Sequence, residues 1–521
     1  MGPRGAASQR IDVTSEDAMP KRNPTARNAR PRKPSSGTKG TRSRAAHRPI
    51  ISLQTKKGTK KKPAAQNVLI VNMIPRSLSS ETNQDSEPTL AVNPANPLQI
   101  AASAFTPDPG GGSLAPIYVS TDGGNTWVLN SIVPSDSSQG SMTADITVAF
   151  SSTSNVLYAG IIRLPIVNNS TRLNILSTKD FLSSSKMKVL VDRMGVDQPY
   201  VEAATAASGP EKGKDQVFVG SNDFGAPNGK TATIDRSSNG RGFTKVRIES
   251  RTTSGQDGPS VRPAVHSDGT VYAVYHAWRT FDQNTGNRTA DIVVVRDDNW
   301  GNGAPPFGAL KDTDNLSGRR VVQNSHFNFD DFLGLERTGG AVSIAVDPTD
   351  SNVVYVSWAD TQNGVYTIHL RKSSNRGVAW SANDLKSVGS ATNPALAVNN
   401  KGAIGFLYQQ LVGTGASQRF VTHFQHSDDG QNWTDLVLAD TPANRPEKSF
   451  DPYLGDYAHL LSIGSNFYGI FSANNEPDPA HFPNGVSYQR NHDFTKKQLL
   501  DTDGVAPVDP SIDPFFFKVS L

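Results

Sequence analysis

The feature that most constrains the fold of this chain is a pair of short apolar strands that recurs seven times. In all but one of the pairs the first strand begins at a polar residue, often followed by proline, and the second strand follows a small turn. Val, Ile, Tyr and Phe alternate with other residues in these segments, which is typical of β-strands. The first strands begin 52 to 79 residues apart, as "EPTLAVNP", "DITVAFSS", "QPYVEAAT", "RPAVHSDG", "AVSIAVDP", "NPALAVNN" and "DPYLGDYA". This spacing predicts an all-β propeller of four-stranded blades, with seven blades favoured and six as the alternative.

A third strand in several repeats ends in a turn with Ser, Asp or Asn, Gly and an aromatic residue at similar offsets. The carboxylate can accept N–H groups of its own turn, the glycine permits a positive φ, and the tryptophan can cover the blade edge. Because turn chemistry explains every residue, we predict a structural role. The complete copy, "STDGGNTW", has Ser120, Asp122, Gly124, Thr126 and Trp127, one partial copy supplies Asp428, Gly430 and Trp433, and another supplies Asn375, Gly377 and Trp380.

This turn resembles the Asp-box, or BNR repeat, of sialidases and related β-propellers, and the frame around it covers about residues 66–520. The resemblance implies that the Asp-boxes lie on the face opposite the starts of the first strands. It also implies a closed ring of blades without an open sheet edge. We expect the early "QNVLIVNMI" or the late "DPFFFKVSL" to complete a terminal blade.

The charge divides the chain into a basic tail and an acidic body. Residues 1–65 carry 17 Lys and Arg against three acids, a net charge of +14, whereas the whole chain is only +4. The tail is rich in Pro, Ser and Gly and has no apolar periodicity, so we predict a disordered tail over 1–65 and a propeller over 66–521. Attraction to an anionic surface and a solubilising extension without a partner are equal alternatives. Without aromatic residues to stack on bases, the tail does not favour sequence-specific nucleic-acid recognition.

The starts of the first strands and the ends of the second strands meet on one face of a propeller, the channel face. Carboxylates and an arginine on a concave surface suit a polar, hydroxyl-rich ligand, although solvated strand ends are also ordinary. We call the seven starting residues the mouth ring, with Glu87, Asp145 and Asp451 as catalytic candidates. The mouth ring consists of Glu87, Asp145, Gln198, Arg262, Ala341, Asn393 and Asp451.

The ends of the second strands add aromatic residues beside charged ones. Rings that stack on sugars next to hydrogen-bonding groups are a recurring way to bind glycans, although a single tryptophan more often packs in the interior. We therefore predict ligand contacts from Gln198, Arg262, Asn393, Trp278, Arg279, Trp358, Asp360, Asp456 and Tyr457.

Catalytic sialidases clamp a carboxylate with three arginines and use a tyrosine nucleophile with a glutamate, as the resemblance implies. Only Arg262 is basic in the mouth ring, so Arg163, Arg279 or Arg337 would have to join it. Tyr457 follows Asp456 and is a candidate nucleophile. The family's Phe-Arg-Ile-Pro motif is missing ahead of the first Asp-box, so we carry over no sialidase catalytic residue.

Composition excludes several other kinds of chemistry. The chain has no cysteine, which rules out disulfides and thiolate chemistry, and it has no zinc-helix or phosphate-loop motif. Two acidic segments, "KDTDN" and "DTDGVAPVDPSIDP", lack the spacing of an EF-hand. We therefore assign no metal ligand and no cofactor, and keep calcium as a minor alternative. We expect a soluble chain, because no signal peptide or transmembrane helix is recognisable, and the compartment stays open.

Three functional hypotheses remain. The favoured one is a sialidase-like propeller whose channel face binds a glycan or another polar ligand without sialidase activity. The second is a glycosidase or polysaccharide lyase that uses carboxylates of the channel face. The third is an assembly factor tethered by its basic tail.

Overall fold

We describe the protein from a computed structural model. The described residues are 67–106, 108–109, 112–135, 142–164, 171–253, 261–282, 284–285, 287–327, 341–362, 364–447 and 453–521. The predicted basic tail, Asp451 and Arg337 lie outside these ranges, so the expectations about them stay predictions. No helix among the described residues is long and apolar enough to cross a membrane.

The described part of the chain is all-β and forms eight sheets, six of which have four antiparallel strands in chain order. The first two are β2 (Ser86–Val92), β3 (Ile100–Phe105), β4 (Tyr118–Ser120) and β5 (Val128–Leu129), then β6 (Met142–Phe150), β7 (Leu157–Leu164), β8 (Arg172–Thr178) and β9 (Lys188–Met194). The next two are β10 (Val196–Thr205), β11 (Asp215–Asp223), β12 (Ala232–Ser237) and β13 (Thr244–Arg247), then β14 (Val261–Val265), β15 (Val271–Phe281), β16 (Arg288–Asp297) and β17 (Arg319–Phe327). The last two are β18 (Val342–Asp347), β19 (Asp350–Gln362), β20 (Val365–Ser373) and β21 (Lys386–Gly389), then β22 (Ala391–Val398), β23 (Ile404–Val412), β24 (Arg419–Ser427) and β25 (Thr434–Pro442).

The seventh large sheet joins the two ends of the described chain. Its order is β26 (His459–Ile463), β27 (Asn466–Asn474), β32 (Ile512–Ser520), β1 (Asn67–Asn72) and β28 (Ser487–Tyr488). Both terminal segments therefore complete this blade, because β1 pairs antiparallel with β32 and β32 pairs with β27. A small sheet of β29 (His492–Asp493), β30 (Gln498–Leu500) and β31 (Pro507–Val508) lies in the insertion between β27 and β32.

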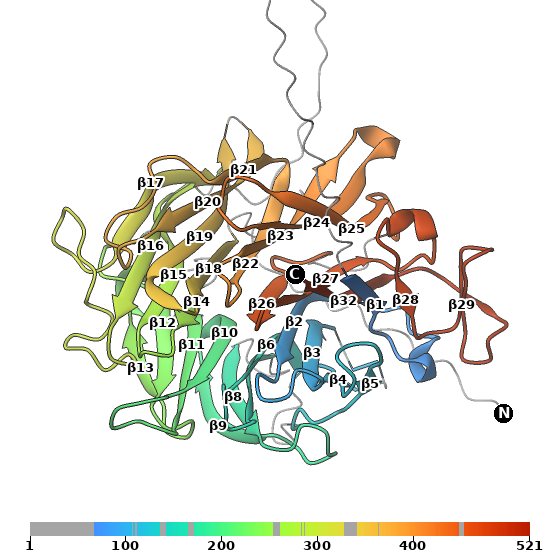
Figure 1. The fold of residues 1–521 in the computed structure, drawn as a ribbon, viewed down its shortest axis with the longest axis horizontal. Coiled ribbons are helices and arrows are strands. Elements are labelled where there is room, and N and C mark those ends of the chain that lie inside the picture. The colour runs from blue at the N-terminus through green and yellow to red at the C-terminus, as the bar shows by residue number, and fades with distance from the viewer. Residues whose placement is uncertain are drawn as a thin grey trace, which may run out of the picture. The chain divides into compact units, whose positions relative to one another are not determined.

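The first strands of the seven large sheets surround a common centre, as a β-propeller requires (Figure 1). They contact one another in the closed order β2, β6, β10, β14, β18, β22, β26 and back to β2. The blade number stays a prediction of seven, and this order of contacts agrees with it.

Hydrogen bonds between neighbouring first strands fix the register of the repeats. In each bond the acceptor is the side chain two residues after the position of a mouth-ring residue or, in the seventh repeat, of its equivalent. The donor is the backbone N–H three residues after the equivalent position in the neighbouring sheet. The bonds run from Val148 N to Thr89 Oγ1 (3.2 Å), from Val201 N to Thr147 Oγ1 (3.0 Å), from Leu396 N to Ser343 Oγ (3.0 Å) and from Leu90 N to His459 Nδ1 (3.1 Å). Glu87, Asp145 and Asn393 therefore occupy equivalent positions in their sheets. In the seventh repeat the bond from Leu90 N to His459 Nδ1 puts Tyr457 at the equivalent position, whereas Asp451 lies outside the described residues.

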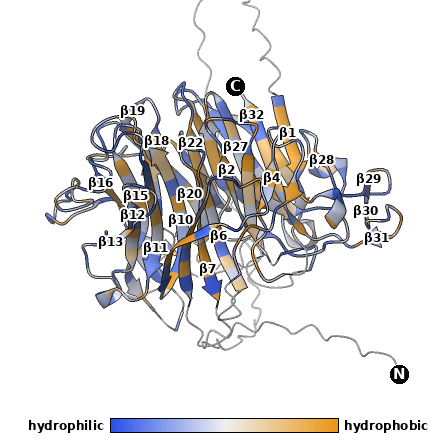
Figure 2. Ribbon diagram, turned by 90° about the horizontal axis from the view of Figure 1, so that it is seen from below, coloured by the Kyte–Doolittle hydropathy of each residue, from blue (hydrophilic) through white to orange (hydrophobic). Residues whose placement is uncertain are grey.

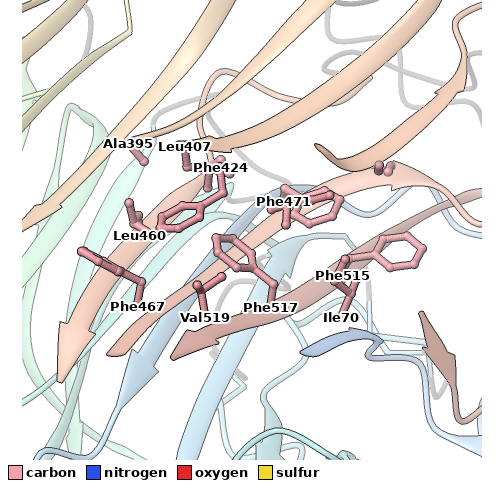
Figure 3. Packing of buried hydrophobic residues seen from close by; sticks show 14 of the residues in the cluster. Ile70, Ala395, Leu407, Phe424, Leu460, Phe467, Phe471, Phe515, Phe517 and Val519 are labelled. Carbon is pink, nitrogen blue, oxygen red and sulfur yellow. The ribbon is translucent and has the colours of Figure 1, made fainter. Parts of the chain in front are cut away.

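Apolar residues fill the space between sheets. They follow the strands, and the turns at the strand ends are mostly hydrophilic (Figure 2). The largest cluster lies around the closing sheet, where Phe424 contacts Phe467 and Phe517 with ring centroids 5.3 and 5.4 Å apart (Figure 3). Burial of large aromatic side chains contributes strongly to the stability of a folded protein, so these rings hold the closing sheet against the neighbouring sheet.

The turn after β4 has the hydrogen bonds expected from its sequence. Ser120 Oγ accepts from Gly124 N (2.9 Å), and Asp122 Oδ1 accepts from Thr126 N (2.9 Å). Trp127 is 1% exposed and donates from Nε1 to Gly124 O (3.0 Å). These contacts are all internal to the turn, which agrees with a structural role.

The equivalent turn after β24 differs from the prediction by one residue. Asp429, not Asp428, accepts from Gln431 N (2.7 Å) and Asn432 N (2.8 Å). Gly430 donates from its N–H to Ser427 Oγ (2.8 Å), so the serine two residues before the carboxylate sets the register. The sequence "SDDG" offers two adjacent aspartates, and only the tertiary geometry selects the second.

Candidate functional site

Three residues of the mouth ring have unusual backbone conformations. Glu87, Gln198 and Asn393 have φ of 49°, 50° and 55°, and each precedes a proline. The strand register shifts around each of them, which marks a β-bulge. A positive φ in a residue other than glycine costs on the order of 1–3 kcal/mol, and such strain is concentrated at functional sites. The starts of these three strands therefore have a strained backbone conformation that β-propensity does not explain.

Arg262 lies at the centre of the channel-face polar groups. Its guanidinium carbon is 4.3 Å from the ring centroid of Tyr200 and 5.0 Å from that of Tyr457. Burial lowers the pKa of Arg262, while the two tyrosines and the nearby carboxylates of Asp145 and Glu87 act in the opposite direction. The structure therefore brings Glu87, Asp145, Arg262 and Tyr457 near one another.

His459 fixes the orientation of Tyr200. Its Nδ1 accepts from Leu90 N at 3.1 Å, so the proton of the neutral ring is on Nε2, which donates to Tyr200 Oη at 3.0 Å. Burial, with a smaller contribution from Arg262, lowers the pKa of His459 to about 3. The imidazole is thus neutral at physiological pH and acts as a positioning group for the tyrosine.

Glu202 is a channel-face residue that the sequence reasoning missed. It lies on β10, two residues after Tyr200 and four after Gln198, and it lines the same cavity as Arg262 and Tyr457. Burial raises its pKa from 4.5 to about 8. Period-two alternation from Gln198 could have found it, because residues two apart on a strand share one face.

The channel-face cavity is small. Its volume is about 40 Å³, and its polar lining comes from Tyr200, Glu202, Arg262, Ser343 and Tyr457. This volume has room for roughly three water molecules. A whole sugar ring therefore does not fit inside, and a larger ligand would have to lie across the mouth.

Other mouth-ring residues act between blades. Asn393 is fully buried and donates from Nδ2 to Gly455 O (2.8 Å) and to Gln409 Oε1 (3.0 Å). Glu87 Oε1 accepts from Asp456 N (3.2 Å), and both residues are buried. Asn393 is therefore an interblade linker, which corrects the prediction that it contacts a ligand.

The predicted sugar platform at Trp358 is wrong, because the ring is only 1% exposed. It stacks on His369 with centroids 4.9 Å apart and donates from Nε1 to Asp360 Oδ2 (3.1 Å). Asp360 also accepts from Ser325 Oγ (2.8 Å). Trp358 and Asp360 form an internal polar network that no ligand in the channel would touch.

Trp278 and Arg279 also lie away from the channel-face cavity. Trp278 is 4% exposed and packs against Phe281 and Phe327. Arg279 Nε donates to Asp291 Oδ2 (2.7 Å). The prediction that this pair contacts a channel ligand is therefore wrong, since Trp278 packs within its own sheet and Arg279 binds Asp291 and, in the segment after β13, Thr252 O (3.3 Å).

An arginine triad does not assemble in the described part of the chain. Arg163 is buried and donates to Asn174 Oδ1 (3.2 Å) and Thr143 Oγ1 (3.3 Å). Arg279 is engaged as described above, which leaves Arg262 as the only arginine that lines the cavity among the described residues. The described residues therefore do not form a three-arginine clamp, and Arg337 lies outside them.

The acidic segment "KDTDN" is used for ion pairs. Asp312 Oδ2 lies 2.7 Å from Arg320 Nε, and Asp314 Oδ2 lies 2.8 Å from Arg251 Nε. These arginines occupy the oxygens that calcium would require, so this segment is not a cation site.

No model of a known protein family matches the sequence, and no curated protein matches it. Similar solved structures include an α-L-arabinofuranosidase from Fusarium graminearum in complex with an iminosugar inhibitor, at 10% identity and a TM-score of 0.42, which covers 86% of this chain and 97% of that chain. Another is the Trypanosoma rangeli sialidase with the inhibitor DANA, at 12% identity and a TM-score of 0.37, covering 84% and 55%. Drosophila Semaphorin 2a matches at 9% identity and a TM-score of 0.39, covering 77% and 75%. Likeness at this level carries no conclusion about the activity of this chain.

Proposed function

We propose that the protein is a glycoside hydrolase whose channel face holds the scissile bond, with Glu202 as the proton donor. The observation that carries the proposal is the raised pKa of Glu202, about 8, on a face that also holds Asp145 and Glu87 near Arg262. Two carboxyl groups whose environments push their pKa values apart are the requirement for acid and base in glycoside hydrolysis.

The roles follow from charge. Glu202 keeps its proton at neutral pH and can deliver it to the glycosidic oxygen as the bond breaks. Asp145 or Glu87, held near the guanidinium of Arg262, would supply the negative charge that faces the developing oxocarbenium ion. Tyr200 and Tyr457 flank the arginine and offer hydroxyl groups to a sugar.

A neutral glycan suits this site better than an acidic one. A single arginine lines the cavity among the described residues, and it lies between two tyrosine rings. The small cavity admits only the reacting end of a chain, so the remaining sugar units would lie over the mouth. We also assign the turns after β4 and β24 to the Asp-box type, on the opposite face.

The cavity of about 40 Å³ favours a second candidate, in which the channel face binds a glycan without cleaving it. The third hypothesis, an assembly factor tethered by its basic tail, depends on residues outside the described ranges. Nothing in the site supports it.

The test is a panel of neutral and acidic aryl glycosides and polysaccharides assayed with the wild type, Glu202→Gln and Glu211→Gln. Glu211 is the matched control, because it is a surface residue paired with Lys214 at 3.1 Å. Loss of a general acid lowers kcat about 10²- to 10⁴-fold, and we expect the loss to shrink for leaving groups that need no protonation. Glycan binding without turnover by the wild type would select the second candidate. Full activity of Glu202→Gln would rule out the assigned role.

A further inference from the structure

Three buried carboxyl groups meet where the two ends of the described chain join. Glu81 and Asp85 lie between β1 and β2, and Asp513 lies on β32; we call these three residues the closure cluster. One oxygen of each lies within 4.8 Å of the others. Glu81, Asp85 and Asp513 are 8%, 1% and 0% exposed. This buried cluster differs from groups of exposed acidic side chains, which are common without a bound ion.

The closure cluster has more negative charge than its ion pairs balance. Among the described residues, only Arg490 forms ion pairs with it, with Nη1 2.9 Å from Asp513 Oδ2 and 4.0 Å from Glu81 Oε2. Three ionised carboxylates and one guanidinium leave a net charge of −2. Because charges buried without a partner are costly, the cluster requires either protons or a cation.

Some carboxylate oxygens of the closure cluster accept hydrogen bonds, and others do not. Asp513 is occupied, since its Oδ2 accepts from Asn72 Nδ2 (2.6 Å) and its Oδ1 from Ser511 Oγ (3.1 Å). In contrast, no hydrogen bond of normal geometry reaches either Asp85 oxygen or Glu81 Oε2. Thr106 lies close enough to Asp85 to lower its pKa, against the stronger effect of burial.

Tyr118 gives independent evidence for a ligand. It comes from β4, in the neighbouring sheet, is fully buried, and has a hydroxyl without a hydrogen-bond partner. After burial, the largest contributions to its raised pKa come from Asp85, Glu81 and Asp513. Tyr118 packs in one hydrophobic cluster with Val71, Met73 and Phe516, on the two segments that carry Asn72 and Asp513, so its buried hydroxyl lies beside the closure cluster without a hydrogen-bond partner.

We propose that the closure cluster binds one Ca²⁺ ion. All the donors are oxygens, which hard cations prefer, and there is no imidazole or thiolate that would favour zinc or copper. A divalent cation would neutralise the net charge of −2. Ca²⁺ suits irregular sets of six to eight oxygens, whereas Mg²⁺ retains several waters and demands octahedral geometry.

The position of the site defines its effect. Its ligands come from the segment after β1, from β32 and from β4, so the ion would link the N-terminal and C-terminal segments to the first blade. It would thereby strengthen the closure of the ring. Of the acidic segment "DTDGVAPVDPSIDP", only Asp513 takes part, while Asp509 is exposed. The proposal does not depend on the enzymatic role of the channel face.

The experiment measures binding of radioactive calcium to the full chain after treatment with a chelator, together with the melting temperature. We expect one ion per chain and a rise in Tm of about 3 °C at 100 times Kd, given the size of the chain. Asp85→Asn should lose both effects, and Asp509→Asn, the exposed control, should keep them. A wild type that binds no calcium, or Asp85→Asn that binds it as well as the wild type, would overturn the proposal.

A milder variant covers the case in which Asp85→Asn fails to fold. Tyr118→Phe removes only the unpartnered hydroxyl and should weaken calcium binding about tenfold or more, with the stoichiometry unchanged. A Tm that responds to lower pH but not to calcium would mean that protons neutralise the cluster, and the proposal would be wrong.

Discussion

The raised pKa of Glu202 makes a quantitative prediction about stability. Its pKa is 4.5 in the unfolded reference and about 8 in the folded protein, where burial disfavours the charged carboxylate. Below pH 4.5 both states hold the proton, so this residue does not contribute to the pH dependence. Between pH 4.5 and 8 the unfolded chain releases the proton and the folded chain keeps it, so stability falls as the pH rises. Each pH unit costs about 1.4 kcal/mol, up to about 5 kcal/mol in total.

Glu202→Gln preserves the shape of the side chain and removes its titration. The unfolding free energy of the variant should therefore rise relative to the wild type by about 1.4 kcal/mol per pH unit across this window. In a chain of this size, about 5 kcal/mol corresponds to a difference of about 5 °C in Tm. Calorimetry of both proteins at pH 5, 6, 7 and 8 (~1-unit steps) measures this difference, since other titrating groups cancel between them.

Glu211→Gln is the control for the comparison, because Glu211 is a surface residue paired with Lys214. Its difference from the wild type should stay within about 0.5 kcal/mol at every pH. A difference between wild type and Glu202→Gln that stays flat from pH 5 to 8 (about three units) would show that Glu202 ionises normally. The assignment of Glu202 as a proton donor would then be refuted, whatever the activity of the protein.

Three further substitutions test the structure. Gly124→Ala should lower the unfolding free energy by about 3 kcal/mol or more, because Gly124 has φ of +93° and a new Cβ would lie 2.1 Å from the Phe516 ring. The control Gly209→Ala, at φ of +74° with open space around it, should cost about 1 kcal/mol, and urea unfolding measures both. His459→Gln should remove one pH dependence of stability, because the pKa of His459 is 6.5 in the unfolded reference and about 3 in the folded protein. As the pH falls below 6.5, only the unfolded wild type binds this proton, so its unfolding free energy drops by about 1.4 kcal/mol per pH unit relative to the variant. A difference in Tm between the two proteins that stays constant with pH would contradict this. Arg262→Met should keep the fold, since burial already disfavours the charge, and should weaken glycan binding measured by calorimetry at least tenfold; unchanged affinity would exclude Arg262 from the site.

Much of the fold was predictable, because its signals are local. Alternating apolar residues define strands, and the Ser, Asp and Gly of "STDGGNTW" make hydrogen bonds within eight residues. The repeat located Glu87, Asp145 and Arg262 on one face without any coordinates. It failed for the seventh first strand, because "DPYLGDYA" copies the polar-proline start while the strand begins only at His459.

The chemistry of the site was less predictable, because burial is a property of the assembled ring. The sequence "QPYVEAAT" does not reveal that Glu202 is desolvated, and a tryptophan beside an aspartate reads equally as a sugar platform or as the buried pair Trp358–Asp360. The Asp429 register likewise depended on which carboxylate the folded turn selects.

The sequence by itself determined an all-β chain of repeated strands, the turns that end the third strands, and the face on which polar strand starts gather. Each of these depends on neighbours a few residues apart. Only the tertiary structure decided which carboxyl keeps its proton, which aromatic rings are buried, and how residues as distant as Asn72 and Asp513, 441 positions apart, come to share a hydrogen bond. Those features depend on desolvation and on long-range contacts, which arise when the last blade closes the ring.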